Sequence, residues 1–108
     1  MGGILSKQLK DVERVSEMIK AFAHPLRFKI LTFIDKNKST NVNKIYAALK
    51  IEQSTTSQHL KILRQNNLVL AHRQGKFIFY SVNYEKIAKI LQAMDSYATT
   101  VERKRNAG

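Results

Sequence analysis

The 108-residue sequence contains no cysteine, and none of its apolar runs approaches the roughly 20 residues that a membrane-spanning helix needs. Without cysteine the chain has no disulfide bond, no thiolate metal site and no thiol-based redox or persulfide sensing. The length leaves room for one domain and excludes a multi-domain enzyme. We therefore expect a single domain over residues 1–108 with no membrane span.

Acidic residues are scarce: 8 Asp and Glu stand against 19 Lys and Arg, so the net charge is +11. A compact domain with this excess attracts polyanions, most commonly nucleic acid and next an anionic membrane surface. Residues 53–84 contain no acidic residue at all, but they contain Lys61, Arg64, Arg73 and Lys76. This segment can meet a polyanion without local repulsion. The alternative is a solvated basic face that serves solubility.

Catalytic motifs are also missing. The sequence has no glycine-rich phosphate loop, no nucleophile elbow and no paired-carboxylate motif. Its 8 acidic residues are spread along the chain. We expect no enzyme activity, no catalytic residue and no cofactor.

Apolar residues recur at intervals of three and four in several segments, which predicts amphipathic helices. The predicted helices cover residues 6–23, 25–36, 43–49, 53–66 and 84–101. Ser6 and Asn83 are the expected caps of the first and last helices. His24-Pro25 separates the first two helices, because the residue before a proline avoids helical geometry. Residues 37–41 are expected to be a polar connection and residues 102–108 to fray.

Two of these helices have clear inward positions. In the helix over residues 43–49 we expect Ile45, Ala48 and Leu49 to face the core. In the helix over residues 53–66 the inward stripe is Thr56, Leu60 and Leu63.

The period of the apolar pattern changes after residue 66. Residues 68–74 and 77–82 are rich in β-branched and aromatic residues, and Gly75-Lys76 between them predicts a tight hairpin. Two helices joined by a tight turn and followed by a hairpin describe a winged helix-turn-helix. Residues 43–66 are then the helix-turn-helix and residues 68–82 the wing. We expect a mainly α fold with a β-hairpin (α+β), in the order α-α-α-α-β-β-α.

The helix over residues 53–66 has the side chains of a recognition helix. Away from the core stripe it has short, amide or basic side chains that can bond to base edges and phosphates. These are Gln53, Ser54, Thr55, Ser57, Gln58, Lys61 and Gln65. A helix exposed only to water more often carries pairs of Glu and Lys. Arg73 and Lys76, with His72, flank the hairpin tip, where phosphates or a minor groove would lie; the alternative is an ordinary edge hairpin with solvated cations.

Three motifs occur in order along the chain. Ala23-His24-Pro25-Leu26-Arg27 is followed by Ile30-Leu31; Ser57-Gln58-His59-Leu60-Lys61-Ile62-Leu63-Arg64 is followed by Leu68-Val69; and Arg73-Gln74-Gly75-Lys76 is followed by Phe79-Tyr80. Together they resemble the second helix, the recognition helix and the wing of the ArsR/SmtB family of bacterial repressors. The resemblance covers about residues 10–100.

The resemblance implies a small homodimer that binds an imperfect inverted repeat near a promoter and is released by an inducer. It places Ser57, Gln58 and His59 at the DNA and Arg73 and Lys76 on the wing. For His59 two alternatives stay open, a phosphate contact and a hydrogen bond across the helix pair. We expect Arg27 to tie helices together and His24 to be structural.

The terminal helices predict a dimer independently of the resemblance. A domain this small needs its terminal helices covered, and the last helix has a broader apolar side than one hairpin can bury. Pairing of residues 6–23 and 84–101 between two subunits around a two-fold axis would bury the apolar stripes of both. The alternative is that these stripes pack within one chain. The residues expected in the interface are Leu9, Val12, Ile87, Ile90, Leu91, Met94, Tyr97 and Val101.

The metal sites that the resemblance suggests are incomplete in this sequence. The family's site on the last helix uses Asp-x-His, but Tyr97 stands where the histidine is needed after Asp95, and no histidine occurs after His72. A zinc site needs three or four converging ligands, and the three histidines have no ligand spacing. We expect no metal. The inducer is unknown, and one candidate is a small organic ligand between the terminal helices.

The predicted function is sequence-specific binding of double-stranded operator DNA by a dimeric transcriptional regulator in the cytoplasm, associated with the nucleoid. One alternative is a winged-helix module that binds a protein partner and lacks operator specificity. Nonspecific coating of DNA is another. The acid-free recognition helix and wing favour the operator-binding regulator.

Overall fold

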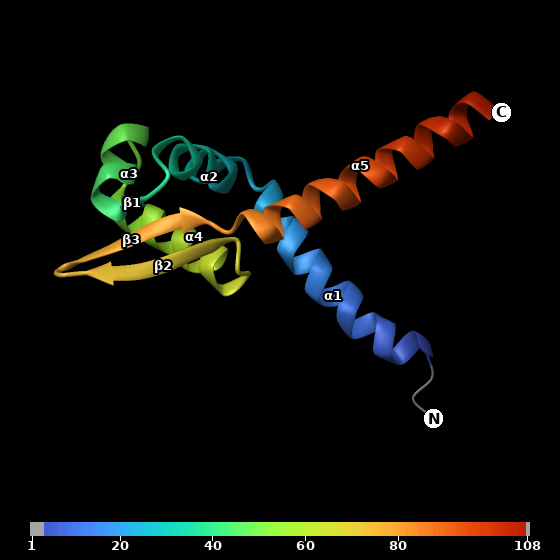
Figure 1. Ribbon diagram of the computed structural model, residues 1–108, viewed down its shortest axis with the longest axis horizontal. Helices are drawn as coiled ribbons and strands as arrows, with labels where there is room; N and C mark the ends of the chain where they lie inside the picture. Colours follow the sequence, from blue (N-terminus) through green and yellow to red (C-terminus); the bar gives the residue numbers. More distant parts are fainter. Residues whose placement is uncertain (1–3, 108) are drawn as a thin grey trace.

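The computed structural model describes the backbone of residues 4–107 and the side chains of residues 12–95. Within this range the chain forms five helices and one three-stranded sheet. Their bounds are α1 Ile4–Ala23, α2 Pro25–Asn37, β1 Thr40–Asn41, α3 Val42–Leu49, α4 Gln53–Gln65, β2 Val69–Gln74, β3 Phe77–Val82 and α5 Tyr84–Ala107. Figure 1 shows α1 and α5 extending from one end of the body and the β2–β3 hairpin from the other. The winged helix-turn-helix is confirmed.

His24 makes the break between α1 and α2. Its backbone is extended, with φ −68° and ψ 126°, and its side chain caps α2. The Leu26 N–H donates to His24 Nδ1 at 3.1 Å. Pro25 occupies the first turn of α2, where a missing N–H costs no hydrogen bond. The structural role expected for His24 is confirmed.

Residues 40 and 41 form a short strand that the sequence did not predict. We expected residues 37–41 to be a polar connection, but β1 pairs with β3, with Thr40 opposite Tyr80 and Asn41 opposite Phe79. Both residues of β1 are buried although both are polar. Asn41 is also the N-cap of α3, because its Oδ1 accepts from the Lys44 N–H at 3.0 Å.

The sheet is antiparallel in the order β1-β3-β2, so the wing is anchored through its second strand. β2 and β3 pair along their whole length, from Val69 opposite Val82 to Gln74 opposite Phe77. Gly75 turns the chain with φ +61°, a left-handed conformation that glycine adopts without strain.

The core lies where α2, α3, α4 and the base of the sheet meet. Its fully buried side chains include Ile30, Ile34, Ile45, Leu60, Leu63 and Leu68. Full burial of one such side chain contributes about 1.5–3 kcal/mol. Phe22 of α1 and Ile90 of α5 close the core at the end from which these two helices extend. In α3 only Ile45 is fully buried. The expectation that Ala48 faces the core was wrong, because its side chain is exposed.

The terminal helices are longer than expected. α1 begins at Ile4, so Ser6 lies inside the helix and is not its cap. α5 continues to Ala107, although we expected residues 102–108 to fray. Glu, Arg and Lys at positions 102–105 are good helix formers, and a helix-breaking residue comes only at Gly108. Asn83 does cap α5, because its Oδ1 accepts from the Lys86 N–H at 3.4 Å.

None of the helices in the described part of the chain is both long enough and apolar enough to cross a membrane.

Two buried threonines predict opposite effects of the same substitution. Thr56 is fully buried and its hydroxyl donates to the Glu52 carbonyl at 3.0 Å. The hydroxyl of Thr40 is equally buried but has no hydrogen-bond partner among the described residues. Because valine keeps the shape and removes the hydroxyl, Thr40→Val should raise the free energy of unfolding by about 1 kcal/mol, and Thr56→Val should lower it by about as much.

Urea unfolding at one fixed protein concentration measures both variants. An equal loss of stability in the two would contradict this view of Thr40.

Candidate nucleic-acid interface

A three-residue turn sets α4 against α3. Lys50 ends α3 in the left-handed region, with φ 54° and ψ 49°, and the Ile51 N–H donates to the Tyr46 carbonyl at 3.1 Å. Glu52, in extended conformation, precedes the first residue of α4. Thr56, Leu60 and Leu63 are each at most 1% exposed, as the apolar spacing predicted. They hold α4 on α2, α3 and β2.

The opposite face of α4 is free. The exposed residues on it include Gln53, Ser54, Ser57, Gln58 and Lys61, while Thr55 and His59 are half-buried. Most of the predicted contact residues on this helix therefore share one accessible surface. Its donors and acceptors are of the kind that read base edges and phosphates.

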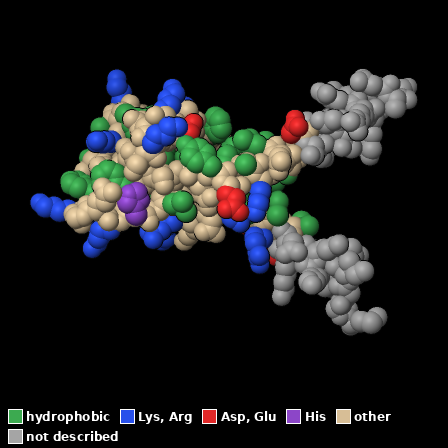
Figure 2. Space-filling view, viewed as in Figure 1, with side chains coloured by type: hydrophobic (Ala, Val, Ile, Leu, Met, Phe, Trp, Pro, Cys, Tyr) green, Lys and Arg blue, Asp and Glu red, His purple; other side chains and the backbone are tan. Residues whose placement is uncertain are grey.

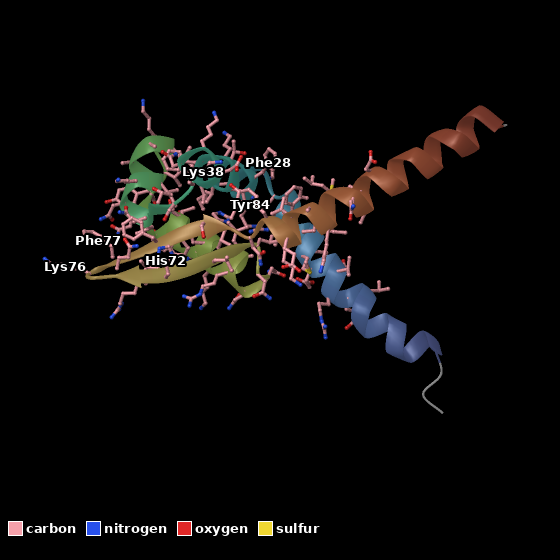
Figure 3. All side chains as sticks on the ribbon, viewed as in Figure 1. Phe28, Lys38, His72, Lys76, Phe77 and Tyr84 are labelled. Carbon is pink, nitrogen blue, oxygen red and sulfur yellow. The ribbon has the colours of Figure 1, made fainter. Side chains whose placement is uncertain are left out.

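The wing extends this surface beyond the helix. Arg73 and Lys76 are both exposed, and Figure 3 shows Lys76 at the tip of the hairpin. Arg73 lies opposite Ile78 in the register. Figure 2 shows Lys and Arg side chains gathered over the end of the molecule that carries α3 and the wing.

Two surface grooves connect α4 with the wing. One of about 310 Å³ lies between α4, the start of α3 and β3, and its lining includes Asn43, Ser57 and Lys76. The other, of about 190 Å³, is lined by Arg64, Ala71, His72, Arg73 and Ile78. Arg64 and Arg73 converge there from two elements, which suits a phosphate group.

Sequence reasoning left Arg64 and Asn43 out of the candidate site. The signal for Arg64 was available, because it follows Lys61 by three residues and so shares its side of the helix. The place of Asn43 depends on β1, which no sequence pattern predicted.

Arg27 joins three elements. Its Nε donates to the Ala21 carbonyl at 2.8 Å and its Nη2 to the Lys20 carbonyl at 3.3 Å, both in the last turn of α1. Its Nη1 lies 3.3 Å from Nδ1 of His59 on α4. The expectation that Arg27 ties helices together is confirmed. Of the two alternatives for His59, the structure shows a hydrogen bond between helices, but it joins α4 to α2 and not to α3. The phosphate contact stays a prediction.

The surroundings of His59 favour its neutral form. Partial burial lowers the pKa of His59 below its ordinary value of 6.5, and the nearby His24 and Arg27 lower this pKa further. The His24 and His59 rings lie 4.9 Å apart between centroids. Because an arginine only donates, Nδ1 of His59 has to be unprotonated to accept from Arg27.

The residues expected at the dimer interface divide into three groups. Val12, Leu91 and Met94 are 61%, 51% and 44% exposed. Ile90 is only 4% exposed and belongs to the core of its own chain, and Ile87 is half-buried against that core. The structure therefore corrects the assignment of Ile90, which has almost no surface left for a partner. The side chains of Leu9, Tyr97 and Val101 lie outside the described residues.

An apolar groove of about 360 Å³ runs between α2 and α5. Phe28, Leu31, Ile87 and Leu91 are among the residues that line it. At its rim the Tyr84 hydroxyl donates to Asp35 Oδ1 at 2.5 Å.

Among the described side chains, no three of His, Asp or Glu come together as a metal site would require.

Comparison with known proteins places this geometry in a family. Residues 24–70, from the cap of α2 into β2, match the family described as "Bacterial regulatory protein, arsR family". The chain is 39% identical over 85 residues to the transcriptional repressor PagR of Bacillus anthracis, covering 79% of this chain and 85% of that relative.

Solved structures of other regulators have the same fold as this chain. The crystal structure of PagR superposes with a TM-score of 0.66 at 38% identity, over 80% of this chain and 98% of that one. NolR from Sinorhizobium fredii gives a TM-score of 0.73 at 30% identity, over 90% of this chain and 96% of that one. A homodimeric winged helix-turn-helix DNA-binding domain from Mycobacterium bovis gives 0.73 at 25% identity, over 92% and 91% of the two chains.

The lowered pKa of His59 predicts a pH-dependent stability. In the unfolded chain His59 titrates near 6.5, and in the folded chain it titrates below that value. Between the two pKa values the unfolded state binds more protons, so the free energy of unfolding rises with pH. The contribution of His59 is complete above pH 6.5 and declines as the pH falls from there to the folded-state pKa.

We expect His59→Gln to flatten the profile of unfolding free energy between pH 7.5 and 5.5, measured by urea titration. His72→Gln is the matched control, because His72 is exposed on the wing. A decline in the His59→Gln variant as steep as in the unmodified chain would contradict the assignment.

Proposed function

Since the chain belongs to the arsR family of bacterial regulatory proteins, and is thus a DNA-binding transcriptional regulator, we propose that it acts as a homodimeric repressor on an inverted-repeat operator. In this proposal α4 enters the major groove and the wing lies over the neighbouring backbone and minor groove.

One observation carries the proposal: the free face of α4 and the wing form a continuous surface of hydrogen-bonding and basic side chains. No acidic residue occurs in residues 53–84, although Glu52 and Glu85 stand directly at their two ends. Glu85 forms an exposed pair with Lys89 at 3.5 Å, on α5. Excess positive charge is thus available where α4 and the wing would meet phosphates.

The candidate contacts divide by chemistry. We assign base-edge contacts to Gln53, Ser54, Thr55, Ser57 and Gln58, whose amides and hydroxyls both donate and accept. Lys61, Arg64, Arg73 and Lys76 suit phosphates, since their cationic groups only donate. For His59 we propose a positioning role, because its hydrogen bond to Arg27 already connects α4 to α1 and α2.

A dimer would place two such surfaces on one duplex. Val12 on α1 and Leu91 and Met94 on α5 offer exposed apolar surface. Figure 1 shows these two helices extending away from the wing. The relative from Mycobacterium bovis is described as homodimeric. A two-fold axis through these helices would present two copies of α4 to major grooves about 34 Å apart.

The role is regulatory and not catalytic, and chromosomal DNA as partner implies a cytoplasmic location.

A small-molecule inducer remains a prediction. The lining of the groove between α2 and α5 is mostly apolar, which suits a mainly apolar ligand. Such a ligand would touch Leu91, which we assign to the dimer interface, and could thereby change the dimer.

Selection from a random duplex pool at about 0.15 M salt tests the proposal. We expect enrichment of an inverted repeat that is bound far more tightly than scrambled DNA. Weak binding without enrichment, which fades as salt rises, would instead indicate generic attraction or a protein-binding module.

The double variant Ser57→Glu/Gln58→Glu should lose at least about a hundredfold in affinity for the selected operator, because two carboxylates would face the phosphates. Fluorescence anisotropy measures this loss. Ala88→Glu/Gln92→Glu is the control: it makes the same charge change at exposed positions of α5, and should stay within about fivefold of the unmodified chain. Unchanged affinity of the Ser57/Gln58 variant would show that α4 is not the recognition helix.

Leu91→Glu should dissociate the dimer, since a carboxylate in an apolar interface loses its hydration without gaining a partner. Sedimentation equilibrium should show the dimer dissociation constant raised by at least about a hundredfold. Leu70→Glu is the control, because Leu70 is 52% exposed and Leu91 is 51% exposed, but Leu70 lies on the wing. Equal dissociation in both variants would argue against an interface on α5.

A further inference from the structure

The tip of the wing has an exposed aromatic side chain that the proposed contacts do not use. Phe77 follows Gly75-Lys76 and is 47% exposed. Figure 3 shows Lys76 and Phe77 together at the tip of the hairpin, at the far end of the molecule from α1 and α5. A large apolar side chain in this position costs solvation and adds nothing to the core.

The register shows that Phe77 is not part of the fold's interior. Along β3, side chains alternate between two faces, so the face of Tyr80 and Val82 is not the face of Phe77 and Phe79. Val82 is buried and Tyr80 packs against the core. Phe77 therefore lies on the outward face of the hairpin, outside the core.

The ring of Phe77 is nevertheless held in place. It meets Phe79 edge-on, with centroids 6.5 Å apart and planes at 68°. Phe79 in turn stacks on His72 across the strand pair, at 6.0 Å and 25°. A ring supported in this way loses less conformational entropy when it binds than a freely rotating side chain would.

Phe77 also borders the candidate DNA surface. It lines the groove of about 310 Å³ together with Asn43, Ser57 and Lys76. A DNA duplex in contact with Ser57 and Lys76 would bring its deoxyribose groups against the ring of Phe77. Lys76 is next in sequence, so a cationic and an apolar group meet the same stretch of backbone.

We propose that Phe77 enters the minor groove beside each half-site and packs against deoxyribose and base edges, which makes it a specificity-determining residue. This inference rests on the proposed operator binding. Apolar side chains that enter the minor groove partly unstack base steps and bend the duplex. Pyrimidine–purine steps such as TA unstack most readily, so the wing would select such steps in the operator flanks.

The experiment measures affinity of the full chain for the selected operator, with either TA or GC steps at the flanking positions. Phe77→Ala is compared with Phe77→Leu, which keeps an apolar side chain, and with Leu70→Ala. Leu70 is the matched control because it is 52% exposed on the same outward face, opposite Ser81 near the base of the hairpin. Thermal unfolding of each variant verifies that the wing still folds.

We expect Phe77→Ala to weaken binding to the TA-flanked operator about tenfold and to abolish the preference for TA over GC flanks. Phe77→Leu should keep most of the affinity and Leu70→Ala all of it within about twofold.

Lys76→Ala should lower the slope of log affinity against log salt by about one, whereas Phe77→Ala should leave that slope unchanged because it removes no charge. A 2-aminopurine placed at the flanking TA step should brighten when the unmodified chain binds, and not when Phe77→Ala binds.

The proposal is overturned when Phe77→Ala binds both operators within twofold of the unmodified chain, or when Leu70→Ala loses as much affinity as Phe77→Ala. Either result, with operator binding by the unmodified chain intact, rejects the specific role of Phe77 and leaves the operator proposal standing. An unmodified chain that enriches no sequence rejects the operator proposal, and the role of Phe77 falls with it.

Discussion

The orientation of α4 about its own axis is the constraint on which the candidate interface depends. Thr56, Leu60 and Leu63 enter the core at intervals of four and three residues and are almost completely buried. A helix held by a stripe this narrow has only one orientation in which no apolar side chain is exposed. That orientation turns Ser57, Gln58 and Lys61 outward. The face that packs in the core and the face proposed to read bases therefore belong to one helix, and neither can rotate without the other.

Arg27 extends this constraint to the N-terminal helix. Its guanidinium satisfies two carbonyls of the last turn of α1 and also reaches His59 on α4. The free carbonyls at a helix C-terminus need donors, and here one side chain supplies two of them. The same side chain thus relates the direction of α1 to the position of α4. Because α1 is one of the two helices proposed to pair between subunits, Arg27 would couple the geometry of the dimer to the position of α4 on DNA.

Elements with a repeated pattern could be predicted from the sequence, because every turn or pleat repeats the signal. α2, α3, α4 and both strands of the hairpin have bounds within one residue of the expectation. β1 has two polar residues and no period, so only its pairing with β3 reveals it. The neighbours Ile90 and Leu91 look alike in sequence, and the direction in which α5 crosses the core decides that the first is buried and the second exposed. The free face of α4 followed from its buried stripe, whereas the grooves that bring Arg64 and Asn43 into the site depend on tertiary packing.

The order of the sheet has a consequence for self-association. β3 has neighbours on both sides, so β2 is left with one open edge of backbone donors and acceptors. Such an edge can pair with the same strand of another molecule and begin an aggregate. Two β2 edges that approached each other would meet the positive charges of Arg73 on both strands, and Lys76 at the hairpin tip would add to the repulsion. The charges proposed to meet a polyanion would thus also oppose edge-to-edge pairing of two proteins when no polyanion is bound.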